Sequence, residues 1–119
     1  MRREKLYLAD LVEAADAIQI FLAGVTQEAF LADDLIRSAV LQKLMIIGEA
    51  AAKLPENLRG RHAEIPWADI IAFRNVAVHA YFTMQWPVVW TVATTQVPEL
   101  RSQVAAILDA EYGADNGAD

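Results

Sequence analysis

The sequence contains no cysteine, which excludes both a disulfide framework and a metal site built from thiolates. Long uncharged apolar runs are also missing, since no stretch reaches the roughly 18 to 20 residues that a membrane-spanning helix needs. The opening stretch MRREKLYLADLVEAADAIQIFLAGV alternates charged with apolar groups, unlike the continuous apolar segment of a signal peptide. These absences predict a cytoplasmic protein that is not inserted into a membrane.

Positive charge is in the minority. The chain has 10 Lys and Arg against 16 Asp and Glu, a net charge of −6, and this balance argues against a protein that coats nucleic acid through nonspecific phosphate contacts. A small local basic site is still compatible with it, because Arg59, Arg61, His62 and Arg74 fall within one short interval. An ordinary solvated loop is the alternative interpretation of this cluster.

What the chain does have is helical periodicity over 119 residues, 55% of them hydrophobic, which indicates one globular domain. From Leu8 onward the apolar residues recur every three or four positions, and Gly24 follows as a stop signal. This pattern predicts a first helix over residues 3–23. Thr26 can then cap a short turn.

A second, longer helix is predicted to begin after Asp33 or Asp34, whose carboxylates can accept hydrogen bonds from its free amides, and to run to Leu54. Gly48 inside this helix costs about 1 kcal/mol relative to alanine, so its presence indicates a close approach by another backbone or by a ligand. The apolar stripe of the helix is predicted to consist of Leu35, Ala39, Leu44, Ile47, Ala51 and Leu54.

The stretch PENLRGRHAEIP reads as a loop with one helical turn, and Pro66 suits the first turn of a third helix. Pro87 marks the entry to the fourth helix, and Pro98 should kink it. We therefore expect an all-α antiparallel bundle of four main helices plus short turns over residues 1–110, with a flexible tail over 111–119. The fourth helix is predicted to bury Val88, Val89, Val92, Val97, Leu100, Val104 and Ile107.

The third helix carries a polar ridge in the segment FRNVAVHAYF, formed by Arg74, Asn75, His79 and Tyr81. A guanidinium offers a planar fork of donors to phosphate oxygens, and an imidazole can move a proton near neutral pH. The pair therefore suits RNA cleavage by the ribose 2′-hydroxyl. Five positions correspond to about 140° around an ideal helix, so a common target requires the helix to end or bend between Arg74 and His79.

Each of these residues also has a structural interpretation. His79 and Arg74 can be a capped structural histidine and a surface arginine, Asn75 a local backbone-bonding group, and Tyr81 a core aromatic with its hydroxyl at the surface. Glu49 and Lys53, four apart, can form a surface ion pair, and Arg37 can pair with Asp34. A metal site is a poor alternative because the chain has two histidines, no cysteine and no tightly spaced carboxylates beyond two residues suited to helix capping.

Four ordered segments add to the single motif: DDLIRSAVLQKLMIIGEAAAKLP, IPWADIIAFRNVAVHAYF, VVW and VPEL. Together they resemble the successive signature blocks of the HepT-like toxin family within the HEPN ribonuclease superfamily, over about residues 33–108. One departure is Ala72-Phe73 before the motif arginine, where a small glycine-like residue and methionine are commoner. This difference can alter packing beneath the motif.

The resemblance implies a two-fold dimer whose cleft combines the Arg-x-x-x-x-His-x-Tyr motifs of both subunits. It assigns catalysis to Arg74 and His79, with Asn75 as companion. Independently of the resemblance, Glu49 can support the arginine beside the cleft. Relatives act as metal-independent endoribonucleases on tRNA or mRNA, without a cofactor. Their antitoxin is a nucleotidyltransferase of the MntA type that transfers AMP to the motif tyrosine, which would be Tyr81. An AMP group beside the arginine would occupy the phosphate site and repel RNA.

Two further interpretations stay open at this point. The chain can be a noncatalytic HEPN adaptor that only binds its nucleotidyltransferase or a nucleotide, or a helical interaction protein in which the motif is structural. For the dimer face, the sequence suggests Trp86, Val89 and Trp90, with core packing as the alternative for each.

Overall fold

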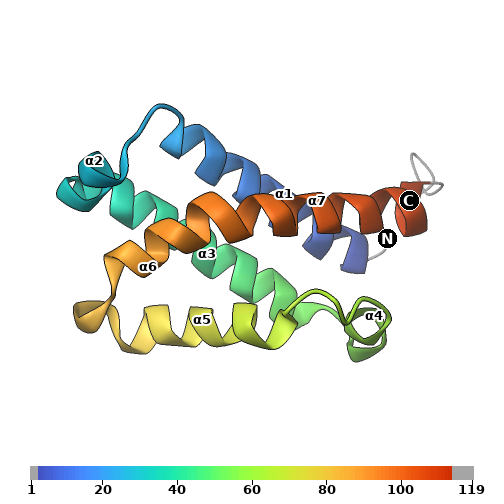
Figure 1. Cartoon of the computed structure of the whole chain (residues 1–119). Coiled ribbons are helices and arrows are strands. Elements are labelled where there is room, and N and C mark those ends of the chain that lie inside the picture. Colours follow the sequence, from blue (N-terminus) through green and yellow to red (C-terminus); the bar gives the residue numbers. More distant parts are fainter. Residues whose placement is uncertain (1–2, 114–119) are drawn as a thin grey trace.

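The long helices alternate in direction along the chain, as Figure 1 shows. The computed structural model describes residues 3–113, and in this range it contains helices and no strand. The α-helices are α1 (Arg3–Leu22), α2 (Gln27–Ala32), α3 (Asp34–Lys53), α4 (Glu56–Arg61), α5 (Trp67–His79), α6 (Trp86–Thr91) and α7 (Val97–Ile107). The predicted all-α class is confirmed, and none of these helices is both long and apolar enough to cross a membrane.

Local sequence signals determine where the helices begin and end. Gly24 has φ of +75° after α1, a conformation that side chains beyond glycine rarely adopt. The Thr26 hydroxyl accepts a hydrogen bond from the amide of Ala29 at the start of α2. Asp33 Oδ1 accepts bonds from two amides that open α3, at 3.0 and 3.2 Å. The predicted stop and caps are therefore confirmed, and α4 is the short helix expected in the loop.

The last part of the chain forms one nearly continuous helix from α6 to Tyr112. Its two π-helical turns, Val92–Gln96 and Leu108–Tyr112, come directly before and after α7. The irregularity expected from Pro98 thus takes the form of the wider turn preceding it. A tail from residue 111 was expected, but Tyr112 is 5% exposed and belongs to the core. Residues 114–119 of that expected tail lie outside the described range.

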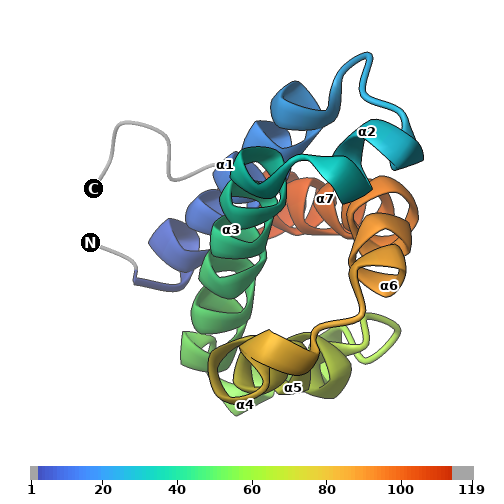
Figure 2. The same ribbon diagram turned by 90° about the vertical axis from the view of Figure 1, so that its left-hand side faces the viewer.

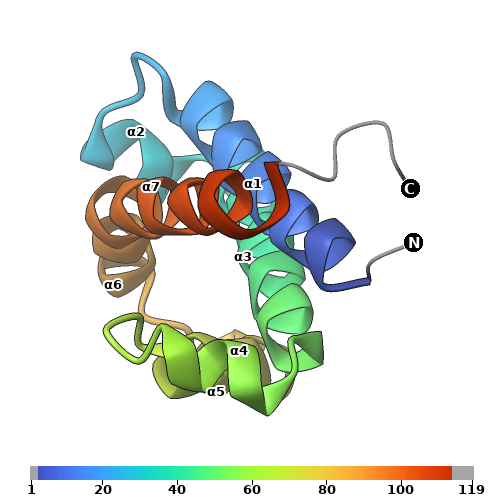
Figure 3. The ribbon, with the colours of Figure 1, turned by 90° about the vertical axis from the view of Figure 1, so that its right-hand side faces the viewer.

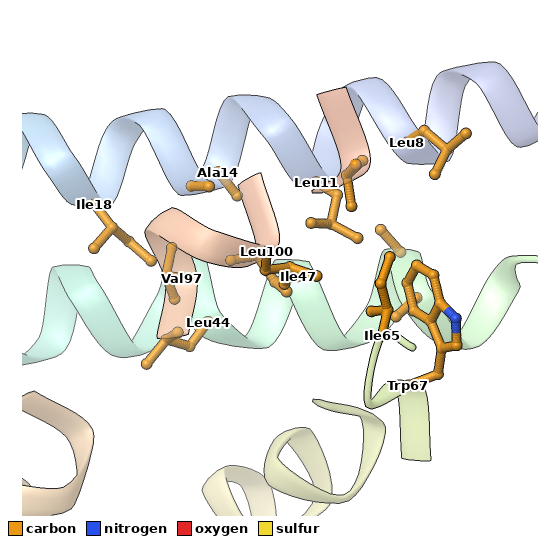
Figure 4. Packing of buried hydrophobic residues seen from close by; sticks show 14 of the residues in the cluster. Leu8, Leu11, Ala14, Ile18, Leu44, Ile47, Ile65, Trp67, Val97 and Leu100 are labelled. Carbon is orange, nitrogen blue, oxygen red and sulfur yellow. The ribbon is translucent and has the colours of Figure 1, made fainter. Parts of the chain in front are cut away.

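The core lies where α1, α3 and α7 meet. Figures 2 and 3 view the bundle along its length and place α3 between α1 and α5. Figure 4 shows apolar side chains of α1, α3 and α7 pointing toward one another. Leu35 and Val88, both predicted to be in the core, are instead 78% and 55% exposed. The buried residues labelled in Figure 4 are Leu8, Leu11, Ala14, Ile18, Leu44, Ile47, Ile65, Trp67, Val97 and Leu100.

Candidate functional site

Helix α5 carries most of the polar ridge, and its start is anchored in the core. Pro66 is the residue immediately before the helix, where its missing N–H has no cost. Trp67 follows, is buried, and donates its indole N–H to the carbonyl of His62 at 3.0 Å. Farther along, Ala77 is buried as well. Trp67 and Ala77 thus anchor the helix, and Arg74 and Asn75 lie between them.

Arg74 lies against α3 at a glycine. A Cβ added at Gly48 would stand 2.5 Å from the Cβ of Arg74 and 3.3 Å from the carbonyl oxygen of Ile70. Real Cβ atoms do not approach other atoms to 2.5 Å, so the missing side chain is what lets the two helices come this close. The close approach expected from Gly48 is confirmed, and the group that approaches is the stem of the motif arginine.

Three hydrogen bonds hold the Arg74 guanidinium. Nη1 donates to Glu49 Oε1 at 3.0 Å, while Nε and Nη2 donate to Asn75 Oδ1 at 3.2 and 2.8 Å. The Arg74 side chain is 23% exposed and that of Glu49 54%. Both groups expected to support the arginine therefore contact it, at a position that solvent and an anion can reach.

The contact of Glu49 with Arg74 differs from the simplest sequence interpretation. The spacing of Glu49 and Lys53 suggests an ion pair between them, but the Glu49 carboxylate bonds to Arg74 on the neighbouring helix. Lys53 instead places its Nζ 5.8 Å from the ring centroid of Tyr7. The i,i+3 pair of Arg37 with Asp34 does form, at 3.4 Å.

His79 is the last residue of α5 and is exposed. Within residues 3–113 its ring has no hydrogen-bond or ion-pair partner. The helix continues unbroken through Arg74 and ends only after His79, so the end or bend that a common target within one chain requires is not found. Because five helical positions span about 140°, one chain presents the guanidinium and the imidazole on different sides of α5.

Tyr81 follows in the short 3₁₀ turn Tyr81–Thr83. Its side chain is 40% exposed, and its ring meets those of Phe82 and Trp86 edge-on at centroid distances of 5.6 and 6.1 Å. The core-aromatic interpretation of Tyr81 is therefore wrong. The rings of Phe82 and Trp86 pack against it at this exposed position.

The basic residues before α5 do not join Arg74. Arg61 Nη2 and His62 Nε2 both contact the carboxylate of Glu111 on the last helical turn. The hydrogen bond from Arg61, and next that from His62, lower the pKa of Glu111 below its ordinary value of 4.5. This cluster is a link between two helices, and the expectation of one shared basic site is not met.

An exposed apolar surface surrounds the end of α5. It comprises Val78, Tyr81 and Phe82, which are between 40% and 98% exposed, and we call it the α5 apolar patch. The residues suggested from sequence for a dimer face lie elsewhere: Val89 is in the core, and the partly buried Trp86 and Trp90 pack against it. Sequence reasoning missed the patch, although apolar residues on every side of α5 were a signal for a second apolar face.

The described residues offer no cluster of side chains suited to a metal ion. No group of three or more His, Asp or Glu side chains in residues 3–113 is arranged to hold a metal ion. Of the two adjacent carboxylates noted in the sequence, Asp33 caps α3 and Asp34 pairs with Arg37.

Known proteins are similar to this chain over the segments that carry the motif. The model of the family described as "Ribonuclease HepT-like" matches residues 11–107. A protein of Thermococcus cleftensis named "Probable ribonuclease HepT" is 35% identical over 102 residues, covering 86% of this chain and 93% of that protein. A protein of Caldanaerobacter subterraneus subsp. tengcongensis is 31% identical over 111 residues, 93% of this chain and 99% of that protein. A protein of Methanocaldococcus jannaschii is 30% identical over 114 residues, 96% of this chain and 94% of its own.

The names printed for the last two proteins describe each as a "Putative RNase". No solved structure gives a significant match to the chain.

Proposed function

The chain belongs to the HepT-like ribonuclease family, and on this premise we propose that it is a metal-independent endoribonuclease. The observation that carries the proposal is that α5 presents a guanidinium held by hydrogen bonds and, on another side, an exposed imidazole that has no partner in residues 3–113. Arg74 and His79 are the proposed catalytic residues. Glu49 and Asn75 support Arg74 through the hydrogen bonds described above.

The proposed reaction is attack of a ribose 2′-hydroxyl on the adjacent phosphorus. The O2′–P bond forms, the P–O5′ bond breaks, and the products are a 2′,3′-cyclic phosphate and a 5′-hydroxyl. His79 accepts the proton of the 2′-hydroxyl, and a second imidazole can give a proton to the leaving oxygen. Arg74 stabilises the charge that builds on the nonbridging oxygens.

A two-fold dimer solves the geometric difficulty that a single chain leaves. Since Arg74 and His79 point to different sides of α5, one phosphodiester is reached best by the arginine of one subunit and the histidine of the other. The α5 apolar patch supports this arrangement: Phe82 is 98% exposed and Val78 52%, and exposed apolar clusters of this kind mark interaction sites. The patch, next to the motif, is the proposed dimer face.

Cleavage of RNA in the presence of EDTA tests the enzymatic proposal. We expect the wild-type protein to cleave a mixed RNA substrate, and Arg74→Ala and His79→Ala to lose activity by at least about 100-fold while remaining folded. Matched controls are Arg101→Ala, which breaks the ion pair with Asp16 on another face, and His62→Ala, which removes the other histidine. Cleavage that survives both motif substitutions would reject the proposal.

The alternative function is a noncatalytic adaptor that binds a nucleotidyltransferase or a nucleotide. It is favoured by one observation, the separation of Arg74 and His79 around a continuous helix. Full partner binding by a wild-type protein that cleaves no RNA under any condition would establish it in place of the enzyme.

We further propose that the protein is the toxin of a toxin–antitoxin pair whose antitoxin is an MntA-type nucleotidyltransferase. The antitoxin would transfer AMP to Tyr81: the Tyr81 hydroxyl loses its proton and attacks the α-phosphorus of ATP, and pyrophosphate leaves. The 40% exposure of Tyr81 in a turn one residue after α5 ends supports its access to such an enzyme. The negative AMP group would then compete with RNA for Arg74.

Modification is tested by incubating the chain with the nucleotidyltransferase and ATP, followed by peptide mass spectrometry. We expect one or more AMP groups on the peptide containing Tyr81, loss of RNA cleavage, and neither effect in Tyr81→Phe. Tyr7→Phe is the matched control on α1. Equal modification of Tyr81→Phe would show that another residue is the acceptor.

A further inference from the structure

The position of Arg74 depends on two consecutive residues of α3. Gly48 leaves the space that the Cβ and Cγ of Arg74 occupy, since an added Cβ would lie 2.5 and 3.3 Å from them. Glu49, the next residue, binds Nη1 at the far end of the same side chain. The stem and the tip of the arginine are therefore both fixed by one turn of the neighbouring helix.

The hydrogen bonds to Glu49 and Asn75 leave some N–H groups of the Arg74 guanidinium free. A guanidinium has five N–H groups. Nε and one N–H of Nη2 go to Asn75 Oδ1, and one N–H of Nη1 goes to Glu49. Two N–H groups are left, one on Nη1 and one on Nη2. Since Nε and Nη2 share Asn75 on one edge of the guanidinium, the free Nη2 hydrogen lies on the edge that faces Nη1, where arginine can bind two phosphate oxygens.

The two supporting contacts differ in origin. Asn75 directly follows Arg74 in α5, so its contact is local to that helix. Glu49 is 25 positions away in sequence, so its contact depends on the packing of α5 against α3. Glu49 thus connects the direction of the guanidinium to the fold of the bundle.

We propose that Gly48 and Glu49 are positioning residues that hold Arg74 so that its remaining Nη1 and Nη2 hydrogens are presented together to one RNA phosphate. This rests on the proposed function for its substrate. Glu49 acts through Arg74 as a hydrogen-bond acceptor and takes no proton from RNA. The negative charge of Glu49 does not itself favour binding, because a carboxylate beside the phosphate site repels RNA.

The variants Glu49→Gln and Glu49→Ala separate the hydrogen bond of Glu49 from its negative charge. Both remove the charge, so a difference between them reports the hydrogen bond. Glutamine keeps an oxygen that can accept from Arg74, whereas alanine does not. We expect kcat of Glu49→Gln to exceed that of Glu49→Ala by about tenfold or more, since small displacements of a catalytic group are costly. The pH dependence of kcat in Glu49→Gln should match that of the wild-type protein. Glu13→Ala, on an exposed face of α1, controls for loss of a helical glutamate.

Binding of a 2′-O-methyl RNA oligonucleotide supplies a readout that does not need cleavage, because this RNA lacks the attacking hydroxyl. We expect Glu49→Gln to bind it at least about threefold more tightly than Glu49→Ala, as one bidentate phosphate contact depends on the orientation of Arg74. Fluorescence anisotropy at one fixed salt concentration measures this difference.

Two outcomes overturn the inference. If both variants lose activity to the same extent and the pH profile of the residual activity loses a limb, Glu49 is a proton-transfer group. If both match the wild type in kcat and in binding, Arg74 needs no support from α3. A wild-type protein that cleaves no RNA defeats the proposed function alone, and the difference in binding between the two variants then still decides whether Glu49 positions Arg74.

Discussion

Helix α5 is held in two different ways on its two sides. On the side facing α3, Gly48 and Arg74 are in direct contact and no added atom fits between them. On the side facing α7, Ile70 and Phe73 border a cavity of about 360 Å³ that also reaches Leu44 on α3 and Leu100 on α7. The difference indicates that close packing is concentrated at the motif arginine, while the other side of α5 tolerates open space.

Near the start of α5, ionic contacts link the segment before it to the last helical turn. There Arg61 and His62 contact Glu111, close to the buried Trp67. An ion pair of this kind is weaker and more exposed than the packed contact at Gly48, because water screens its charges. Changes at Gly48 and at this link should therefore differ in size and in what they affect.

Gly48→Ala should have the largest effect. The new methyl group would force α5 away from α3, and overpacking of this kind costs about 1–3 kcal/mol. It would also displace Arg74, so we expect RNA cleavage to fall by about 100-fold. Thermal unfolding and kcat/KM measure the two effects separately.

Gly60→Ala is the matched control for that substitution. Gly60 lies in α4, and nothing is within 4 Å of a Cβ added there. Alanine at this helical position should leave stability unchanged or raise it by up to about 1 kcal/mol. If Gly48→Ala behaved like Gly60→Ala in both measurements, the close approach of the two helices would not be needed for function.

Many features of the fold can be predicted from local sequence, because the signals that determine them extend over only a few residues. The stop at Gly24 and the caps at Thr26 and Asp33 act over a few residues, and the sequence predicts all three correctly. Gly48 is similar, since a glycine inside a strong helical pattern indicates a close neighbour. The pattern cannot identify that neighbour as Arg74, which is 26 positions farther along the chain.

The failures share a different cause, because periodicity identifies an apolar face without showing whether another element covers it. Leu35, in the first turn of α3, and Val88, near the start of α6, continue apolar stripes but have no covering helix, and both are exposed. Glu111 and Tyr112 stand in a polar ending, and only tertiary contacts show that they belong to the domain. The roles of Arg74, His79, Tyr81, Asn75 and Glu49 in catalysis stay predictions.

Glu111→Gln should have the smallest effect, and that effect should depend on pH. Arg61 and His62 lower the pKa of Glu111 in the folded protein, so its carboxylate stabilises the fold above the unfolded pKa, near 4.5, and the contribution is lost as the pH falls through the lower folded value. We expect the variant to be less stable than wild type by under about 1 kcal/mol at pH 7. The difference should shrink progressively below pH 4.5.

Urea unfolding at pH 7 and at pH 3.5 measures this change, with Asp109→Asn as a control on the same helical turn. RNA cleavage should be unaffected at pH 7, because Arg74 is held from α3 and not from the end of the last helix. A stability difference that is equal at both pH values would mean that the Glu111 side chain acts through packing rather than charge. A loss of cleavage would instead mean that the ionic link near the start of α5 also controls Arg74, and the contrast with the packed contact at Gly48 would not hold.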